Sequence, residues 1–165
     1  MNKILVLYYS WSNGNTERIA KQVADELQAD LCSIDTVKPY PKDYNTTVNQ
    51  GQEEVEAHVK PEIKKLEKDI KDYDTIILGT PTWWYTMAPA VLTFLSENDF
   101  TNKTVVCFQT HGGWPGHALE DMETLCKGAN CQYSYAIQFD SNGKDHLVTQ
   151  ESEIEAWIKQ LKNGL

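Results

Sequence analysis

The stretch "ILVLYYSWSNGNTERIAKQVADEL", residues 4–27, decides the fold of this chain. Its apolar start predicts a buried strand over 3–9, and apolar residues at helical spacing predict a helix over 16–28. The two are joined by a short loop, "SWSNGNT" at 10–16, that is rich in small hydrogen-bonding residues. A buried strand that leads so directly into a helix is typical of α/β proteins.

The rest of the chain repeats this alternation. Further strands are predicted at 31–34, 74–80, 103–110 and 132–139. A Pro/Tyr loop at 37–45 precedes an amphipathic crossover at 48–70, in which Pro61 is expected in the first turn of a second helical piece, and later helices are predicted at 89–95, 119–126 and 151–162. Strands that alternate with helices favour one α/β domain over 1–165, a parallel sheet covered on both faces as a three-layer α/β/α sandwich.

Composition limits the classes of partner. The chain has 165 residues, of which 41% are hydrophobic, and a formal net charge of −9. This charge argues against binding to nucleic acid and against docking on anionic membranes, because both need a positively charged face. It suits a partner protein with a basic patch; alternatively, it only keeps the protein soluble. Neither a signal peptide nor a membrane span is recognised, so a cytoplasmic protein is expected. The four cysteines are expected to be buried thiols, and the histidines form no metal motif.

The loop after the first strand has the features of an anion site. Backbone N–H groups at a helix N-terminus and the positive end of the helix dipole attract a phosphate. The loop adds a tight bend at Gly14 and the polar side chains of Ser10, Ser12, Asn13, Asn15 and Thr16. It contains no Lys or Arg, which favours a phosphate monoester over a polyphosphate with magnesium. Alternatively, these residues only cap the helix. The dinucleotide and P-loop fingerprints are both absent.

Two more unusual loops follow strands of the same predicted sheet. The loop "TPTWWYTM", 80–87, places three adjacent aromatic residues where a buried strand leaves the sheet, which is costly unless something flat covers them. The loop "THGGWPGH", 110–117, has glycines that allow close approach of a ligand, with Trp114 as a candidate rim residue. Ligands of parallel α/β sheets bind beyond the carboxyl ends of the strands, so all three loops are expected at one site.

These motifs resemble the flavodoxin family over most of the chain. "SWSNGNTERIA" resembles the flavodoxin phosphate loop, with Asn13 as an extra residue before Gly14, and "PYPKDY" resembles a segment of one flavodoxin-like subfamily. "YDTIILGTPTWWYTMAPAVLTFL" and "TVVCFQTHGGWPG" resemble the two loops that flank the flavin. The resemblance implies a flavodoxin-like fold, a five-stranded parallel sheet of order 2-1-3-4-5, and FMN as the cofactor.

The resemblance also implies a set of cofactor-binding residues. The FMN phosphate would be held by Ser10, Ser12, Asn13, Gly14, Asn15 and Thr16. The ring would be bordered by Thr80, Pro81, Thr82, Trp83, Trp84 and Tyr85 on one side and by Thr110, His111, Gly112 and Gly113 on the other. We hypothesise that His111 lies near the ring, where a protonated imidazole would favour the reduced, anionic flavin; alternatively, it is an exposed loop histidine. Aromatic walls and an acidic surface would instead lower the flavin's potential.

Three functions are compatible with this sequence. The first is an electron carrier between partner proteins with a basic docking face, with no catalytic residue of its own. The second is an FMN-dependent NAD(P)H:quinone oxidoreductase, which would need a further pocket over the flavin. The third is a cofactor-free interaction domain of the receiver type, although the acidic cluster that such a domain needs is missing from the strand ends. The sequence leaves the oligomeric state open.

Overall fold

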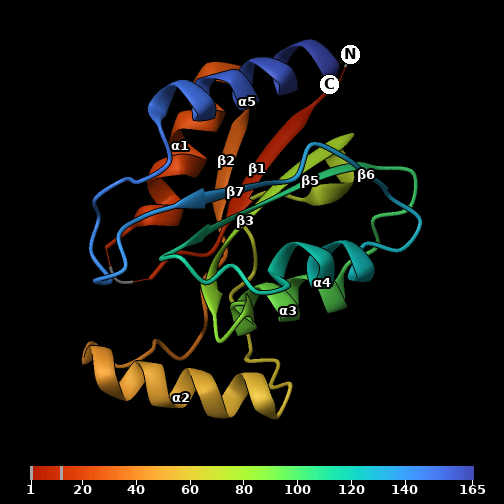
Figure 1. Ribbon diagram of the computed structural model, residues 1–165. Helices are drawn as coiled ribbons and strands as arrows, with labels where there is room; N and C mark the ends of the chain where they lie inside the picture. Colours follow the sequence, from red (N-terminus) through yellow and green to blue (C-terminus); the bar gives the residue numbers. More distant parts are fainter. Residues whose placement is uncertain (1, 12) are drawn as a thin grey trace.

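The chain folds as a parallel sheet with helices on both faces (Figure 1). The computed structural model describes residues 2–11 and 13–165. The strands are β1 (Ile4–Tyr8), β2 (Asp30–Ser33), β3 (Thr75–Trp83), β4 (Thr86–Met87), β5 (Thr104–His111), β6 (Asn130–Cys131) and β7 (Tyr135–Gln138). The helices are α1 (Asn15–Leu27), α2 (Tyr44–Glu56), α3 (Pro89–Glu97), α4 (Ala118–Leu125) and α5 (Glu151–Gly164), with a short 3-10 helix η1 at Ile70–Asp72.

The order of the sheet confirms the predicted topology. Its path is β2-β1-β3-β5-β6, with every neighbouring pair parallel, and β7 pairs with β5 further along. Counted in long strands, with β6 and β7 as one interrupted strand, this is the order 2-1-3-4-5. The order reverses at β1, which has β2 on one side and β3 on the other, so a ligand site is expected at the carboxyl end of β1.

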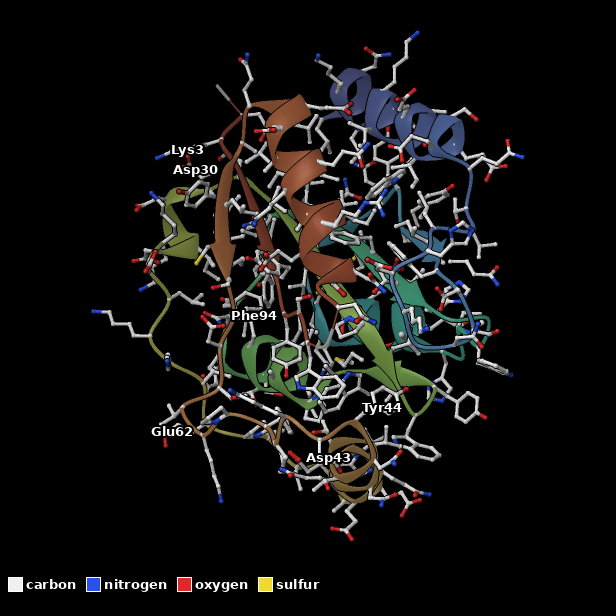
Figure 2. The ribbon with its side chains drawn as sticks, turned by 90° about the vertical axis from the view of Figure 1, so that its left-hand side faces the viewer. Lys3, Asp30, Asp43, Tyr44, Glu62 and Phe94 are labelled. Atoms are coloured by element: carbon white, nitrogen blue, oxygen red, sulfur yellow. The ribbon has the colours of Figure 1, made fainter. Side chains whose placement is uncertain are left out.

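Each face of the sheet has its own hydrophobic core. Leu5 and Leu7 of β1 pack with α3 and α4, whereas Val6 and Tyr8 pack with α1 and α5. This alternation follows from the two-residue period of a strand. Phe94 of α3 is fully buried in the first of these cores (Figure 2). Because both faces are covered, the central strands β1, β3 and β5 are mostly apolar and buried, as the sequence pattern predicted.

The fifth predicted strand is interrupted, which corrects the continuous strand expected at 132–139. Residues 132–134 lie between β6 and β7 and face only residues 106–107 of β5, so one extra residue is inserted. This is a β-bulge, and Tyr133 within it has a φ of 58°. The Tyr133 carbonyl accepts a hydrogen bond of 2.7 Å from Trp157 Nε1 of α5. This hydrogen bond therefore fixes the bulge to helix α5.

The prediction of a second helical piece with Pro61 in its first turn is wrong. Residues 57–69 form no helix, and Ile63 makes an isolated antiparallel bridge with Thr36. The Pro61 carbonyl accepts a hydrogen bond of 2.7 Å from the Thr93 hydroxyl of α3. The apolar residues of this segment sit at helical spacing, but these tertiary contacts hold the backbone extended.

Helix α2 is displaced from the other four helices. It lies beyond the end of the sheet at which β3 finishes (Figure 1). Its cap is Asp43, whose carboxylate accepts a 2.9 Å hydrogen bond from the Thr46 backbone N–H. Asp43 and Tyr44 mark the start of the helix in Figure 2, just below the ends of the strands. This position allows α2 to contribute to a site at the carboxyl edge.

Candidate ligand-binding site

A cavity of about 350 Å³ lies at the carboxyl edge of the sheet. Its volume is within the usual range for a small-molecule site. Of the sequence-predicted residues, those in its wall are Asn13, Asn15, Thr16, Pro81, Thr82, Trp83, Trp84, Tyr85, Thr110, His111 and Gly112. Ser10, Gly14, Thr80 and Gly113 are not in the wall, and Ser12 lies outside the described residues. The structure therefore brings all three predicted loops to one place.

The first loop is held by its own polar groups. Gly14 caps α1 with a φ of 72° and no side-chain hydrogen bond, and the Ser10 hydroxyl instead accepts a 3.3 Å bond from the Glu17 backbone N–H. The Thr16 hydroxyl is buried and lies 2.8 Å from that of Thr110. Ser10 Oγ therefore caps the helix as an acceptor, which leaves its O–H as a donor, and Thr16 ties α1 to β5.

The two asparagines of this loop hold a fourth loop that the sequence analysis missed. Asn15 Nδ2 donates a 2.9 Å hydrogen bond to the Lys144 carbonyl, and Asn13 Nδ2 donates to the Gly143 carbonyl. The Asn15 Oδ1 atom is buried and has no hydrogen-bond partner among the described residues. One N–H of each asparagine amide is thus used inside the protein, while the Asn15 Oδ1 acceptor has no partner among the described residues.

The second loop is a β-hairpin, which corrects the prediction of a strand that ends at Thr80 and a loop over 80–87. Strand β3 continues to Trp83 and pairs antiparallel with β4. The two turn residues are Trp84 and Tyr85, with φ of 48° and 69°. Two positive φ values define a type I′ turn, which normally carries Asn or Gly. Thr80, which precedes the hairpin turn in β3, is buried. Its hydroxyl accepts a 3.0 Å hydrogen bond from the Ala88 backbone N–H, so it joins the two ends of the hairpin.

The three aromatic residues of the hairpin have different environments. The Trp83 ring packs edge-on against Tyr9 and Tyr40, with ring centroids 5.9 and 4.9 Å apart. Trp84 and Tyr85 are 39% and 52% exposed. Trp84 Nε1 donates a 2.9 Å hydrogen bond to the Val48 carbonyl of α2. One ring is therefore core packing, and two remain at the mouth of the cavity.

Helix α2 supplies a wall that sequence reasoning also missed. Tyr44, Thr47, Val48 and Gly51 line the cavity. A Cβ atom at Gly51 would lie 3.0 Å from the Trp83 ring, so the absent side chain is what lets helix and hairpin pack. Tyr44 stacks on Trp11 at a centroid distance of 5.8 Å. Nothing local in the sequence predicts that α2 lies at the strand ends. The aromatic residues Tyr44 and Trp11 were the one available signal for this wall.

The fourth loop, residues 139–146, forms part of the cavity wall. The Asp140 carboxylate accepts backbone N–H bonds from Lys144, His146 and Asn142 at 2.9, 3.0 and 3.1 Å. These bonds, that from Lys144 first, hold the pKa of Asp140 below its usual range. The signal for this loop was present in the sequence "DSNGKDH", because Asp, Ser, Asn and Gly are typical turn residues.

The third loop places His111 and Trp114 at the cavity. His111 Nδ1 accepts a 3.0 Å hydrogen bond from the Gly113 backbone N–H, and burial lowers the pKa of its imidazole. Trp114 is 60% exposed at the rim. No group of His, Cys, Asp or Glu side chains within 2–11 and 13–165 could hold a metal ion. In the same part of the chain, no helix has the length and apolar character to span a membrane.

Comparison with known proteins identifies the family. A family model described as Flavodoxin matches residues 3–161. The chain therefore belongs to the flavodoxin family, and the receiver-type alternative is set aside.

Individual relatives carry two kinds of name. Flavodoxin 1 of Escherichia coli K12 is 26% identical, and the alignment covers 96% of this chain and 93% of that protein. An NAD(P)H dehydrogenase (quinone) of Caulobacter vibrioides NA1000 is 37% identical over 57% of this chain and 45% of that protein. The chain spans about half the length of the curated relatives that it matches at 31–37% identity.

A solved structure supports the fold. A flavoprotein from Lactobacillus acidophilus NCFM, crystallised in complex with FMN, superposes with a TM-score of 0.71. It is 24% identical, and the match covers 95% of this chain and 99% of that one. The fold predicted from the loop and strand pattern is therefore confirmed.

Proposed function

We propose that this chain is an FMN-binding electron-transfer protein whose cofactor occupies the cavity at the carboxyl edge of the sheet. The observation that carries the proposal is the combination of an aromatic wall with the N-terminus of α1 at the point where the strand order reverses. When bound, FMN supplies the electron chemistry, and the protein contributes binding, orientation and the electrostatic environment.

The phosphate end of FMN suits the start of α1. The first N–H groups of a helix have no intrahelical partner, and the helix dipole favours an anion there. Because the amide groups of Asn13 and Asn15 hold the fourth loop, the backbone would supply most of the donors. The extra residue Asn13 thus has a role of its own, which is to fasten the loop that closes the cavity.

The sugar-alcohol chain of FMN suits the unpartnered atom at Asn15. Its Oδ1 is an acceptor, so it would repel a phosphate oxygen but would accept a hydrogen bond from a ribityl hydroxyl. A buried acceptor without a partner costs free energy, and a hydroxyl at this place would remove that cost. The N–H donors at the start of α1 would therefore suit a phosphate, and the Asn15 Oδ1 acceptor would suit a hydroxyl group. FMN carries both groups, because its phosphate is attached to its ribityl chain.

The ring of FMN suits the exposed aromatic side chains. Trp84, Tyr85 and Trp114 would border it, while Trp83 holds the hairpin in place from behind. Stacking of a flat ring on these side chains would cover apolar surface that is otherwise exposed. Pro81, Thr82, Thr110, His111 and Gly112 would form the edge between the aromatic wall and the strand ends.

A ligand titration tests this assignment. Purified protein stripped of flavin would be titrated with FMN, riboflavin and FAD, with flavin and tryptophan fluorescence followed together. We expect one-to-one quenching by FMN, and weaker binding of riboflavin because it lacks the phosphate. Trp114→Phe keeps a ring at the rim and serves as the matched control for Trp114→Ala. Equal affinity for FMN and riboflavin, or no binding of either at micromolar concentrations, would refute the assignment.

The acidic character of the chain supports docking with basic partner proteins. A net charge of −9 would steer such partners, and the exposed rim of the cavity would bring the flavin edge to the contact. The rate of electron transfer to a positively charged protein such as cytochrome c should then fall as ionic strength rises. A cytoplasmic location is part of the same proposal, because all four cysteines are free thiols, as expected in a reducing compartment.

A second candidate is an FMN-dependent NAD(P)H:quinone oxidoreductase. The specific observation in its favour is the match to the quinone reductase of Caulobacter vibrioides. The two functions differ in a direct assay, in which the FMN-loaded protein is mixed with NADH or NADPH and a soluble quinone. Turnover without any partner protein would establish the reductase, whereas a carrier would need a separate reductase to be reduced.

A further inference from the structure

The segment His111-Gly112-Gly113 forms a turn in which a histidine is held by a backbone amide. The Gly113 N–H donates to His111 Nδ1 at 3.0 Å. Gly113 has a φ of 117°, which residues with a side chain rarely adopt. The imidazole nitrogen that accepts this bond carries a lone pair. In the neutral ring, the proton must then be on the other nitrogen, Nε2.

The surrounding backbone fixes the position of this ring. The His111 carbonyl, at the end of β5, accepts a 2.8 Å hydrogen bond from the Phe139 backbone N–H. On the next residue, a Cβ atom at Gly112 would lie 3.1 Å from the Asp140 carbonyl oxygen. The turn is therefore packed against the fourth loop. Because His111 lines the cavity and its Nδ1 is occupied, Nε2 is the nitrogen left for a ligand.

Two charged side chains of opposite sign share the cavity wall with His111. Asp140 and Lys144 are the charged side chains in the cavity wall, and Tyr44 and Tyr85 are its other titratable groups. The Asp140 carboxylate is already bound by backbone N–H groups of its own loop. Burial lowers the pKa of His111, and a proton on Nδ1 would also displace the Gly113 N–H. Both effects favour the neutral imidazole.

We propose that His111 is a neutral hydrogen-bond donor of the ligand site, whose Nε2–H is fixed by the Gly113 amide and serves an acceptor atom on the flavin ring. This proposal rests on the proposed FMN site and names one contact in it. It replaces the expectation that a protonated His111 stabilises the reduced flavin. A fixed neutral donor contributes a directed hydrogen bond whose strength is constant across neutral pH, whereas a cation would make the flavin's potential depend on pH there.

The tautomer can be measured in the FMN-free protein. Imidazole ¹⁵N NMR spectra of the full chain would be recorded from pH 5 to 8. The signals of His111 would be assigned as those that are missing from the spectrum of His111→Gln. We expect a single Nε2–H form for His111 that stays neutral below the ordinary pKa range of histidine. A mixed or Nδ1–H tautomer, or protonation of His111 at or above that ordinary range, would overturn the proposal. In Gly113→Ala, the tautomer should become mixed.

The contact with the flavin is tested separately. His111→Gln keeps an N–H donor, whereas His111→Ala removes it. We expect FMN affinity to fall by about two- to tenfold in the alanine variant, as for loss of one neutral hydrogen bond, and to change less in the glutamine variant. Equal losses in both variants would contradict a donor role. If wild-type protein binds no FMN, the proposed function and this ligand both fail, but the NMR result still decides the tautomer.

Discussion

Replacement of Tyr85 by Asn tests whether the hairpin stores backbone strain. Tyr85 has a φ of 69° at the second turn position, and half of its surface, 52%, is exposed. A non-glycine residue in this region costs about 1–2 kcal/mol, and Asn tolerates the region well. Loss of a half-buried aromatic side chain costs roughly 1 kcal/mol, by comparison with 1.5–3 for a fully buried one. The two changes nearly cancel.

A matched control is available at Tyr44. This residue is also 52% exposed, and it is the first residue of α2, where the backbone is helical. Tyr44→Asn loses a comparable apolar surface, including the stack on Trp11, without relief of strain. We therefore expect Tyr85→Asn to change the free energy of unfolding by less than about 0.5 kcal/mol, and Tyr44→Asn to lower it by about 1 kcal/mol.

Urea unfolding of the FMN-free protein measures this difference. With a denaturant slope of about 2 kcal/mol/M, the midpoints of the two variants should differ by about 0.5 M. Tyr85→Phe keeps both the ring and the strain and should unfold like wild type. If Tyr85→Asn is as destabilising as Tyr44→Asn, the turn stores no strain and the reasoning is wrong. Both asparagine variants should weaken FMN binding by about two- to tenfold, because each removes a ring from the cavity.

Three more predictions concern the core and the closing loop. Gly79→Ala should destabilise the protein by at least about 1–3 kcal/mol in thermal unfolding, because the new Cβ would lie 2.1 Å from Cζ of the buried Phe108 ring; an unchanged Tm would contradict this packing. Thr16→Val should cost about 1–3 kcal/mol in urea unfolding by leaving the buried Thr110 hydroxyl unpaired, and adding Thr110→Val should restore part of the loss; a double variant less stable than the single one would refute the pairing. The Asp140 carboxylate, whose pKa is lowered from 3.8, should hold its loop fully above that pH and release it as pH falls further; the protection factors of amides 142–146 should therefore fall on acidification below that pH, and in Asp140→Asn they should already be low at pH 5, whereas protection factors unchanged by the substitution would contradict this role.

Local patterns in the sequence were sufficient to predict the frame of the molecule. The apolar runs that became β1, β3 and β5 need cover on both faces, and this requirement selects a parallel sheet with helices on each side. The step from a strand into "SNGNT" and a helix likewise placed one wall of the site at the end of β1. Both inferences rest on interactions between residues close in sequence, for which periodicity and turn chemistry carry the information.

Only the tertiary structure decided how the site is closed and which groups are free in it. The extended backbone around Ile63, the bulge at Tyr133 and the hairpin turn at Trp84 are all held by contacts with residues far away in the chain. The same is true of Asn15, which sequence pattern assigned to a phosphate and which the fold uses to fasten the fourth loop. The sequence by itself determined that the loops after β1, β3 and β5 reach the carboxyl edge, because local patterns place each of them at the end of a parallel strand. Competition among their hydrogen bonds, which depends on positions in space, decided which atoms remain for a ligand.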